Sequence, residues 1–281
     1  DLHTLFWIGK YLYQVEAVPD LVEKGVITLA ESKRFSKAQN FLWTVRSHLH
    51  YLARRGEDRL TFDVQEQVGC RMGYRNHAGT LGVERFMKHY YLTVKEVGDL
   101  TRIFCAALEA EHQSWNVFKF RALDMFRRDI EGFKLESGRL SVEMGTEFLI
   151  EPVKILRLFR TAQVHKRDIH PRALRLITRH LKLVDSIRDN TEANTLFLQI
   201  LTDSNGADVT LRRLNEAGVF GRFIPDFGRV VAQMQHDMYH VYTVDEHTIF
   251  AIGILHGIEQ GRFKVDMPVA TEVIHKLLSK R

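Results

Sequence analysis

Apolar residues recur at intervals of three and four along most of this chain, and that spacing limits the folds it can adopt. The longest stripe lies between Leu81 and Leu108 and would cover one face of a continuous helix. Its members are Phe86, Met87, Tyr90, Tyr91, Val94, Val97, Leu100, Ile103, Phe104 and Leu108. A helix with one apolar face has to bury it against other elements. The sequence therefore predicts an all-α protein, a multi-helix bundle.

Local signals indicate where the other helices begin and end. Thr28, followed by Glu31, has the spacing of a capping box and predicts the start of a helix that runs to about Arg54. We expect shorter helices over about residues 64–72 and from Trp115 to about residue 130. Another helix should begin at Pro152. Proline is tolerated at the first helical position, because the N–H that it lacks would have no hydrogen-bond partner within the helix.

One segment departs from the helical pattern. Leu135, Leu140 and Val142 flank the pair Ser137-Gly138, which suits the positive φ angles of a tight turn. The sequence predicts one short β-hairpin here.

Charge and composition exclude several classes of protein. The net charge of +5 permits an anionic partner, but most Lys and Arg residues alternate with Asp and Glu, as on an ordinary solvated surface. No single-strand motif or recognition helix stands out, so we expect no nucleic-acid partner. No apolar run is long enough to cross a membrane. Cys70 and Cys105 lack the spacing of a zinc site or a disulfide framework, which favours the reducing cytoplasm.

A basic segment after residue 45 is the first candidate site. Arg46, His50 and Arg54 follow each other at steps of four, hence on one helix face, and Arg59 and Asp63 come next. Guanidinium groups beside a carboxylate can bind a triphosphate and its metal, because arginine offers paired donors to phosphate oxygens. A solvated basic face with internal ion pairs is the alternative, and spacing alone leaves it open.

The segment MQHDMYHVYTVDEHT near the C-terminus is the second candidate site, since it is rich in groups that bind divalent metals. Surface or helix-capping roles are the alternative, with Thr243 or Asp245 at the start of a helix. The metal-capable residues are His236, Asp237, His240, Asp245, Glu246 and His247.

Several stretches of the chain resemble one family, the bifunctional PII uridylyltransferase/uridylyl-removing enzymes. They are DLHTLFWI, LHYLARRGEDRLTFDVQ, VERFMKHYY, EPVKILRLFRTAQ and LRRLNEAGVFGRFIPDFGRVVAQMQHDMYHVYTVDEHTI. Members of that family combine a nucleotidyltransferase domain, a helical bundle that completes it, a metal-dependent His-Asp phosphohydrolase domain and two glutamine-sensing domains.

The resemblance implies that the chain is an internal fragment. Residues 1–150 would form the helical domain that completes the nucleotidyltransferase, residues 151–235 a connecting helical region, and residues 236–281 the truncated N-terminal part of the phosphohydrolase domain. The magnesium-binding carboxylates of the transferase would precede Asp1, and the His-Asp doublet would follow Arg281. The pair His236-Asp237 lies too early to be that doublet, and we expect a structural or surface role for it. We expect no complete catalytic centre, and no catalysis by this chain alone.

The resemblance also assigns candidate roles to single residues. VDEHT matches the first metal-binding histidine of the family, so His247 is the candidate ligand and His240 a weaker one. Arg46, His50, Arg54, Arg59 and the carboxylate Asp63 would line the nucleotide cleft. For the intact enzyme, the implied cofactor is Mg²⁺ or Mn²⁺, the partners are PII and UTP, and the effector is glutamine. PII would receive UMP when glutamine is scarce and lose it by hydrolysis when glutamine is abundant.

Two other functions stay open. One is a related enzyme with another target, either a nucleotidyltransferase such as the adenylyltransferase of glutamine synthetase or a stand-alone phosphohydrolase. YHVYTVDEHTI argues against the adenylyltransferase, which has no His-Asp domain. The other is a helical module that docks PII without catalysis.

Overall fold

The computed structural model describes residues 2–77, 79–120, 129–136, 138–143, 145–236 and 242–278. The chain forms two compact units: unit 1 contains residues 1–124 and 232–243, and unit 2 contains residues 125–231 and 244–281. These limits differ from the predicted boundaries at residues 150 and 235, and the functional assignment of those segments stays a prediction.

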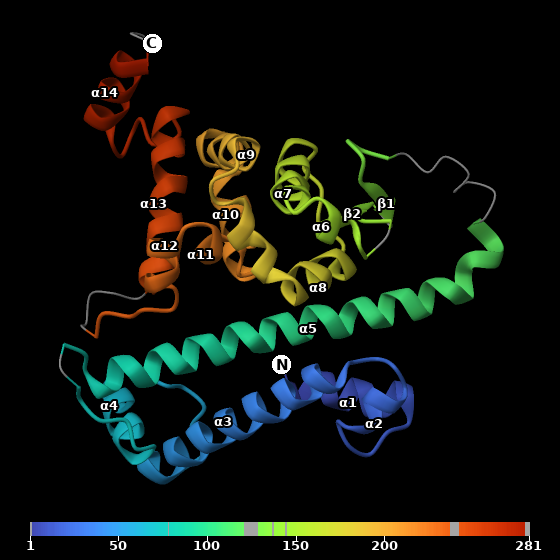
Figure 1. Ribbon diagram of the computed structural model, residues 1–281. Coiled ribbons are helices and arrows are strands. Elements are labelled where there is room, and N and C mark those ends of the chain that lie inside the picture. Colours follow the sequence, from blue (N-terminus) through green and yellow to red (C-terminus); the bar gives the residue numbers. More distant parts are fainter. Residues whose placement is uncertain are drawn as a thin grey trace. The chain divides into compact units, whose positions relative to one another are not determined.

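Unit 1 is built on two long helices that pack against each other, α3 (Leu29–Ala53) and α5 (Gly82–Phe120) (Figure 1). The predicted capping box is confirmed: Glu31 N–H donates to Thr28 Oγ1 at 3.3 Å, and Thr28 N–H donates to Glu31 Oε2 at 2.7 Å. Arg54 ends α3 with a left-handed φ of 54°. The shorter helices of this unit are α1 (Leu2–Tyr13), α2 (Asp20–Glu23) and α4 (Phe62–Arg71).

The apolar stripe of α5 follows the prediction with one difference. Phe86 and Leu100 are buried as expected, but Val94 is 43% exposed. Thr93 takes its place, because it lies seven residues from each of those two and so shares their helix face. Its hydroxyl donates to the carbonyl oxygen of His89 at 2.9 Å, which satisfies a polar group in the core.

The predicted separate helix from Trp115 to Ile130 is wrong. α5 continues through Trp115 to Phe120 without a break, because no proline or glycine interrupts residues 99–120. Residues 121–128 lie outside the described part of the chain. Ile130 forms a backbone bridge with Phe133 instead.

The predicted hairpin is confirmed in unit 2. Strands β1 (Lys134–Glu136) and β2 (Arg139–Ser141) pair antiparallel and form the only sheet among the described residues. Gly138 has a φ of 78°, which glycine adopts without steric cost, while Ser137 lies outside the described residues. The N–H of His170 donates to the carbonyl oxygen of Leu140 at 2.7 Å, which fixes the hairpin to the chain that follows α7.

Helices form the rest of unit 2 around one hydrophobic core that extends from Phe133 to Ile249. α7 begins two residues after Pro152, close to the predicted start. The all-α fold class with one hairpin is thereby confirmed. The elements are α6 (Glu147–Ile150), α7 (Lys154–Val164), α8 (Pro171–Arg179), the 3-10 helix η1 (Leu181–Ile187), α9 (Thr191–Thr202), α10 (Ala207–Glu216), α11 (Val219–Phe223), α12 (Pro225–Val230), α13 (Val244–Glu259) and α14 (Pro268–Leu278).

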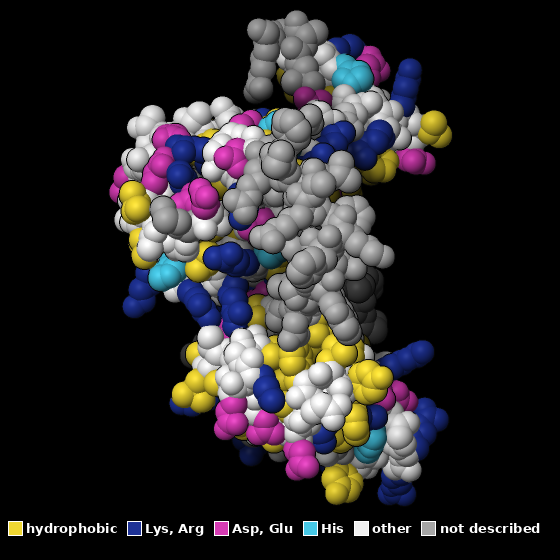
Figure 2. All heavy atoms as spheres, turned by 90° about the vertical axis from the view of Figure 1, so that its right-hand side faces the viewer, with side chains coloured by type: hydrophobic (Ala, Val, Ile, Leu, Met, Phe, Trp, Pro, Cys, Tyr) yellow, Lys and Arg dark blue, Asp and Glu magenta, His cyan; other side chains and the backbone are white. Residues whose placement is uncertain are grey.

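The surface mixes both signs of charge with apolar side chains. Figure 2 shows Lys and Arg (dark blue) interspersed with Asp and Glu (magenta) on the face that it presents, beside exposed hydrophobic groups. None of the helices in the described ranges is long and apolar enough to cross a membrane.

Candidate functional site

The basic segment of unit 1 converges on a carboxylate that sequence analysis did not select. Arg46 Nε donates to Asp58 Oδ1 at 2.8 Å, and its Nη2 donates to Oδ2 at 3.2 Å. His50 Nε2 lies 3.4 Å from Asp58 Oδ1. The left-handed turn at Arg54 reverses the chain after α3, and so brings Asp58 back beside the helix. The hydrogen bond with His50 and then the Arg46 guanidinium hold the pKa of Asp58 below its ordinary value, although desolvation acts to raise it.

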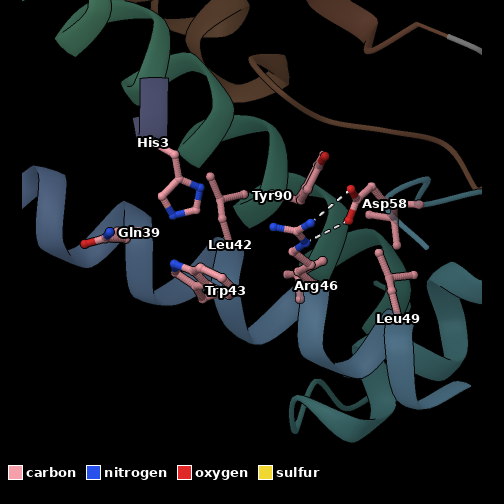
Figure 3. Close-up of a pocket in the computed structure, with 10 residues that line it drawn as sticks. His3, Gln39, Leu42, Trp43, Arg46, Leu49, Asp58 and Tyr90 are labelled. Atoms are coloured by element: carbon pink, nitrogen blue, oxygen red, sulfur yellow. Dashed lines mark hydrogen bonds and ion pairs between the residues drawn. The ribbon is translucent and has the colours of Figure 1, made fainter. Parts of the chain in front are cut away.

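A pocket of about 330 Å³ opens beside this ion pair (Figure 3). Trp43 forms the aromatic wall of the pocket. The His3 ring packs edge-on against the Trp43 ring with 5.0 Å between the ring centroids, and the Arg46 guanidinium lies 5.4 Å from the centroid of Trp43. The lining residues are His3, Gln39, Leu42, Trp43, Val45, Arg46, Leu49, Asp58, Leu60 and Tyr90. The pocket offers an aromatic surface for stacking and a guanidinium for an anion, which would have to displace Asp58 from Arg46.

Three of the other candidate residues do not line this pocket. Arg54, Arg59 and Asp63 are exposed and are not among the residues that line it. Arg54 ends α3, and Asp63 lies in the first turn of α4. The candidate group thus divides into Arg46 and His50, which share Asp58, and three exposed residues that do not line the pocket.

In the second candidate segment, the ring of His236 stacks on that of Phe62 within unit 1, with 4.2 Å between the ring centroids. Asp237 and His240 lie outside the described residues. Thr243 directly precedes α13, the position of an N-cap residue, whereas Asp245 lies inside the helix.

The first turn of α13 is fixed to α10 by two side-chain contacts. Asn215 Nδ2 donates to Asp245 Oδ2 at 2.8 Å, and Arg212 Nε donates to Glu246 Oε2 at 3.2 Å. Both carboxylates are therefore used in packing. His247, the next residue, is exposed.

The donor groups of this segment allow a limited test of the predicted metal site. An exposed imidazole such as that of His247 suits a divalent metal. In the described ranges, however, no three His, Cys, Asp or Glu side chains are grouped so that they could hold one. His247 could supply one ligand, and the others would come from residues outside this set.

Comparison with known proteins gives consistent matches along the chain. Residues 1–105 match the family model of the GlnD PII-uridylyltransferase, and residues 133–223 match that of the uridylyltransferase GlnD third domain. α13, which carries His247, lies beyond both matches. No solved structure matches the chain.

Three curated relatives align with the whole chain, and each is named a bifunctional uridylyltransferase/uridylyl-removing enzyme. The identity is 60% to the protein of Azospirillum brasilense, 51% to that of Rhodospirillum rubrum and 49% to that of Novosphingobium aromaticivorans. The chain spans only 30%, 30% and 31% of their respective lengths. On these matches, the chain belongs to the GlnD family of bifunctional uridylyltransferase/uridylyl-removing enzymes.

Proposed function

We propose that this chain is the helical part of a cytoplasmic enzyme that attaches UMP from UTP to the PII signal protein when glutamine is scarce and removes it when glutamine is abundant. The observation that carries the proposal is the identity of 49% to 60% over the whole chain to relatives named for both activities. One of the two matching family models also names PII.

For uridylyl transfer, we assign unit 1 to the nucleotide side of the reaction. Arg46 lines a pocket with an aromatic wall, and its two donors, which bind Asp58, could bind the phosphate oxygens of a nucleotide whose base stacks on that wall. His50 would help to hold Asp58 when a phosphate takes its place beside Arg46. Arg54, Arg59 and Asp63 remain candidates for the same cleft, but they lie outside this pocket.

For uridylyl removal, we assign His247 as a ligand of a Mg²⁺ or Mn²⁺ ion. A metal ion at such a site supplies an activated water for attack on a phosphoester. The support is the position of His247: it is exposed, and it directly follows the turn that Asp245 and Glu246 fix to α10.

A second function, non-catalytic docking of PII, is favoured by exposed aromatic residues on α1. Trp7 is 66% exposed and Tyr11 is 80% exposed, and large aromatic side chains often anchor protein interfaces. Capture of purified PII by the 281-residue chain, and its loss in Trp7→Ala with Tyr11→Ala, would support docking.

The whole protein, with PII, UTP labelled at the α-phosphate and magnesium, tests the proposed enzyme. We expect label to appear on PII without glutamine and to be released after glutamine is added. Failure to label PII under any condition would refute the proposal.

Arg46→Ala tests the nucleotide assignment, with Arg54→Ala as the matched control. Both variants lose one arginine, half-buried at Arg46 within α3 and exposed at Arg54 just after it, but only Arg46 lines the pocket. We expect a higher KM for UTP or a lower kcat in Arg46→Ala alone. Unchanged kinetics in both variants would remove this segment from the nucleotide cleft.

A further inference from the structure

Unit 2 contains a pocket of about 400 Å³ that belongs to neither candidate site. Three separate segments form it: the end of α7, the loop and first turns of α10, and the turn that follows α13. Most of the residues that line it are polar.

The charged side chains that line this pocket are all cations. They are Lys166, Arg213 and Arg262, one from each segment. Arg213 is held by an ion pair with Asp168 and by a hydrogen bond from its Nη1 to the carbonyl oxygen of Arg167 at 3.2 Å. Lys166 and Arg262 are exposed and have no ion-pair partner within the described ranges.

Three acidic residues adjoin lining residues in sequence: Asp208, in the first turn of α10, Glu259, and Asp203, which is already paired. Asp203, next to the lining loop, accepts hydrogen bonds from Arg160 Nη1 at 2.7 Å and from the N–H of Asn205 at 2.9 Å. Its negative charge is therefore compensated before an anion arrives.

Backbone donors add to the three cations. α10 begins at Ala207 after Gly206, which has no side chain to cap the helix. The N–H groups of residues 207–209 therefore have no partner inside the helix. Such groups, together with the helix dipole, favour an anion near the start of the helix.

The walls of the pocket are fixed by hydrogen bonds between segments. Gln260 Nε2 donates to the carbonyl oxygen of Ser204 at 2.6 Å and joins the turn after α13 to the α10 loop. Gln163 Nε2 donates to the carbonyl oxygen of Ile200 at 3.1 Å and joins α7 to α9. An anion would thus meet cations on a frame that is already ordered, which reduces the entropic cost of binding.

We propose that this pocket binds a phosphate group, either free or as part of a nucleotide. Lys166 and Arg262 together match the charge of a phosphate dianion, and Arg213, which is paired with Asp168, adds hydrogen-bond donors beside those of the backbone. The volume exceeds what a single phosphate needs and leaves room for an attached group. The inference does not depend on the proposed catalytic function, because it rests on the residues of this pocket alone.

Calorimetric titration of the 281-residue chain at constant ionic strength tests the proposal, with inorganic phosphate, pyrophosphate and UMP as probes. We expect saturable binding of at least one probe, weakened at least tenfold in the double variant Lys166→Ala with Arg262→Ala. The matched control is Arg172→Ala with Lys182→Ala, which removes two exposed cations from unit 2 that do not line the pocket.

Each result decides for or against the pocket. Tighter binding of UMP than of inorganic phosphate identifies a nucleotide as the ligand, and equal binding identifies the free anion. Absence of saturable binding for every probe, or equal weakening in the two double variants, would overturn the proposal. Circular dichroism of both variants verifies that they fold, and because no catalysis is measured, the result is independent of the proposed enzyme activity.

Discussion

Asn215 donates a hydrogen bond to the carboxylate of Asp245 across 2.8 Å, with exposed fractions of only 3% and 4% for the two residues. A carboxylate removed from water needs hydrogen-bond donors, so the pair holds the first turn of α13 on α10. His247 lies two residues beyond Asp245 and is exposed. The packing of α10 therefore positions the candidate metal ligand.

Asn215→Ala should destabilise unit 2, because it removes a donor to the buried Asp245 carboxylate. We expect the free energy of unfolding to fall by about 1–3 kcal/mol, as for other buried polar groups that lose a partner. Urea denaturation of the 281-residue chain measures this change. Asn194→Ala is the control, since Asn194 makes an exposed hydrogen bond to the carbonyl oxygen of Arg188. Equal losses in both variants would contradict the role of the buried pair.

Gly228→Ala should also destabilise unit 2, because the new Cβ would overlap the carbonyl oxygen of Gly221 where α11 and α12 approach. Backbone atoms cannot rotate away, so we expect a loss of about 1–3 kcal/mol in the free energy of unfolding. Gly98→Ala on α5 should instead raise the free energy of unfolding. Its Cβ would meet no atom within 4 Å, and alanine stabilises a helix interior by about 0.5–1 kcal/mol over glycine. Thermal unfolding compares the two, and a neutral Gly228→Ala would contradict the close contact.

Thr28→Ala should weaken the start of α3, because the hydroxyl oxygen of Thr28 accepts the N–H of Glu31. We expect a loss of about 1 kcal/mol in the free energy of unfolding. Thr44→Ala is the matched control within α3, where the exposed hydroxyl donates to the carbonyl oxygen of Asn40 and alanine is the better helix former. Urea denaturation should show a loss in the first variant only. A larger loss in Thr44→Ala would argue against the capping box.

Acid should weaken unit 2 through Asp203. Burial acts to raise the pKa of this carboxyl, but hydrogen bonds from Arg160 and from the N–H of Asn205 outweigh it and hold the pKa below its ordinary value. The folded state therefore binds the proton less tightly than the unfolded state. The resulting stability is present above the unfolded pKa and is lost as the pH falls through the folded pKa.

The variant Asp203→Asn tests this pH dependence of stability. The variant should be less stable than the parent at neutral pH, and the difference should shrink on acidification below the ordinary range of aspartate. Urea denaturation at a series of pH values measures it. Asp266→Asn is the control for the loss of one exposed charge. A difference between Asp203→Asn and the parent that is constant over all pH values would contradict the linkage.

The structural features that could be predicted from the sequence are those that residues close together in the chain determine. The capping box at Thr28, the hairpin at Gly138 and the long stripe on α5 are all local patterns, and the structure contains each of them. The misplaced helix start at Trp115 has a local cause too, since nothing in that stretch interrupts α5.

Contacts between residues that lie far apart in the chain could not be predicted from the sequence. Asp58 was part of a charged segment that ended a helix, and only the left-handed turn at Arg54 brings it to Arg46. Trp43 carried a usable signal, because it lies three residues before Arg46 and so on the same helix face. The phosphate pocket had no such signal, because its cations come from three segments up to 96 positions apart, from Lys166 to Arg262.

The most direct test of the account measures both activities of the whole protein in His247→Ala, with labelled UTP and PII. We expect label to be attached to PII at the rate of the parent, and its glutamine-dependent release to be lost. His77→Ala, an exposed histidine of unit 1, should leave both rates unchanged. Release at the parental rate in His247→Ala, or no labelling of PII by the parent protein, would contradict the assignment.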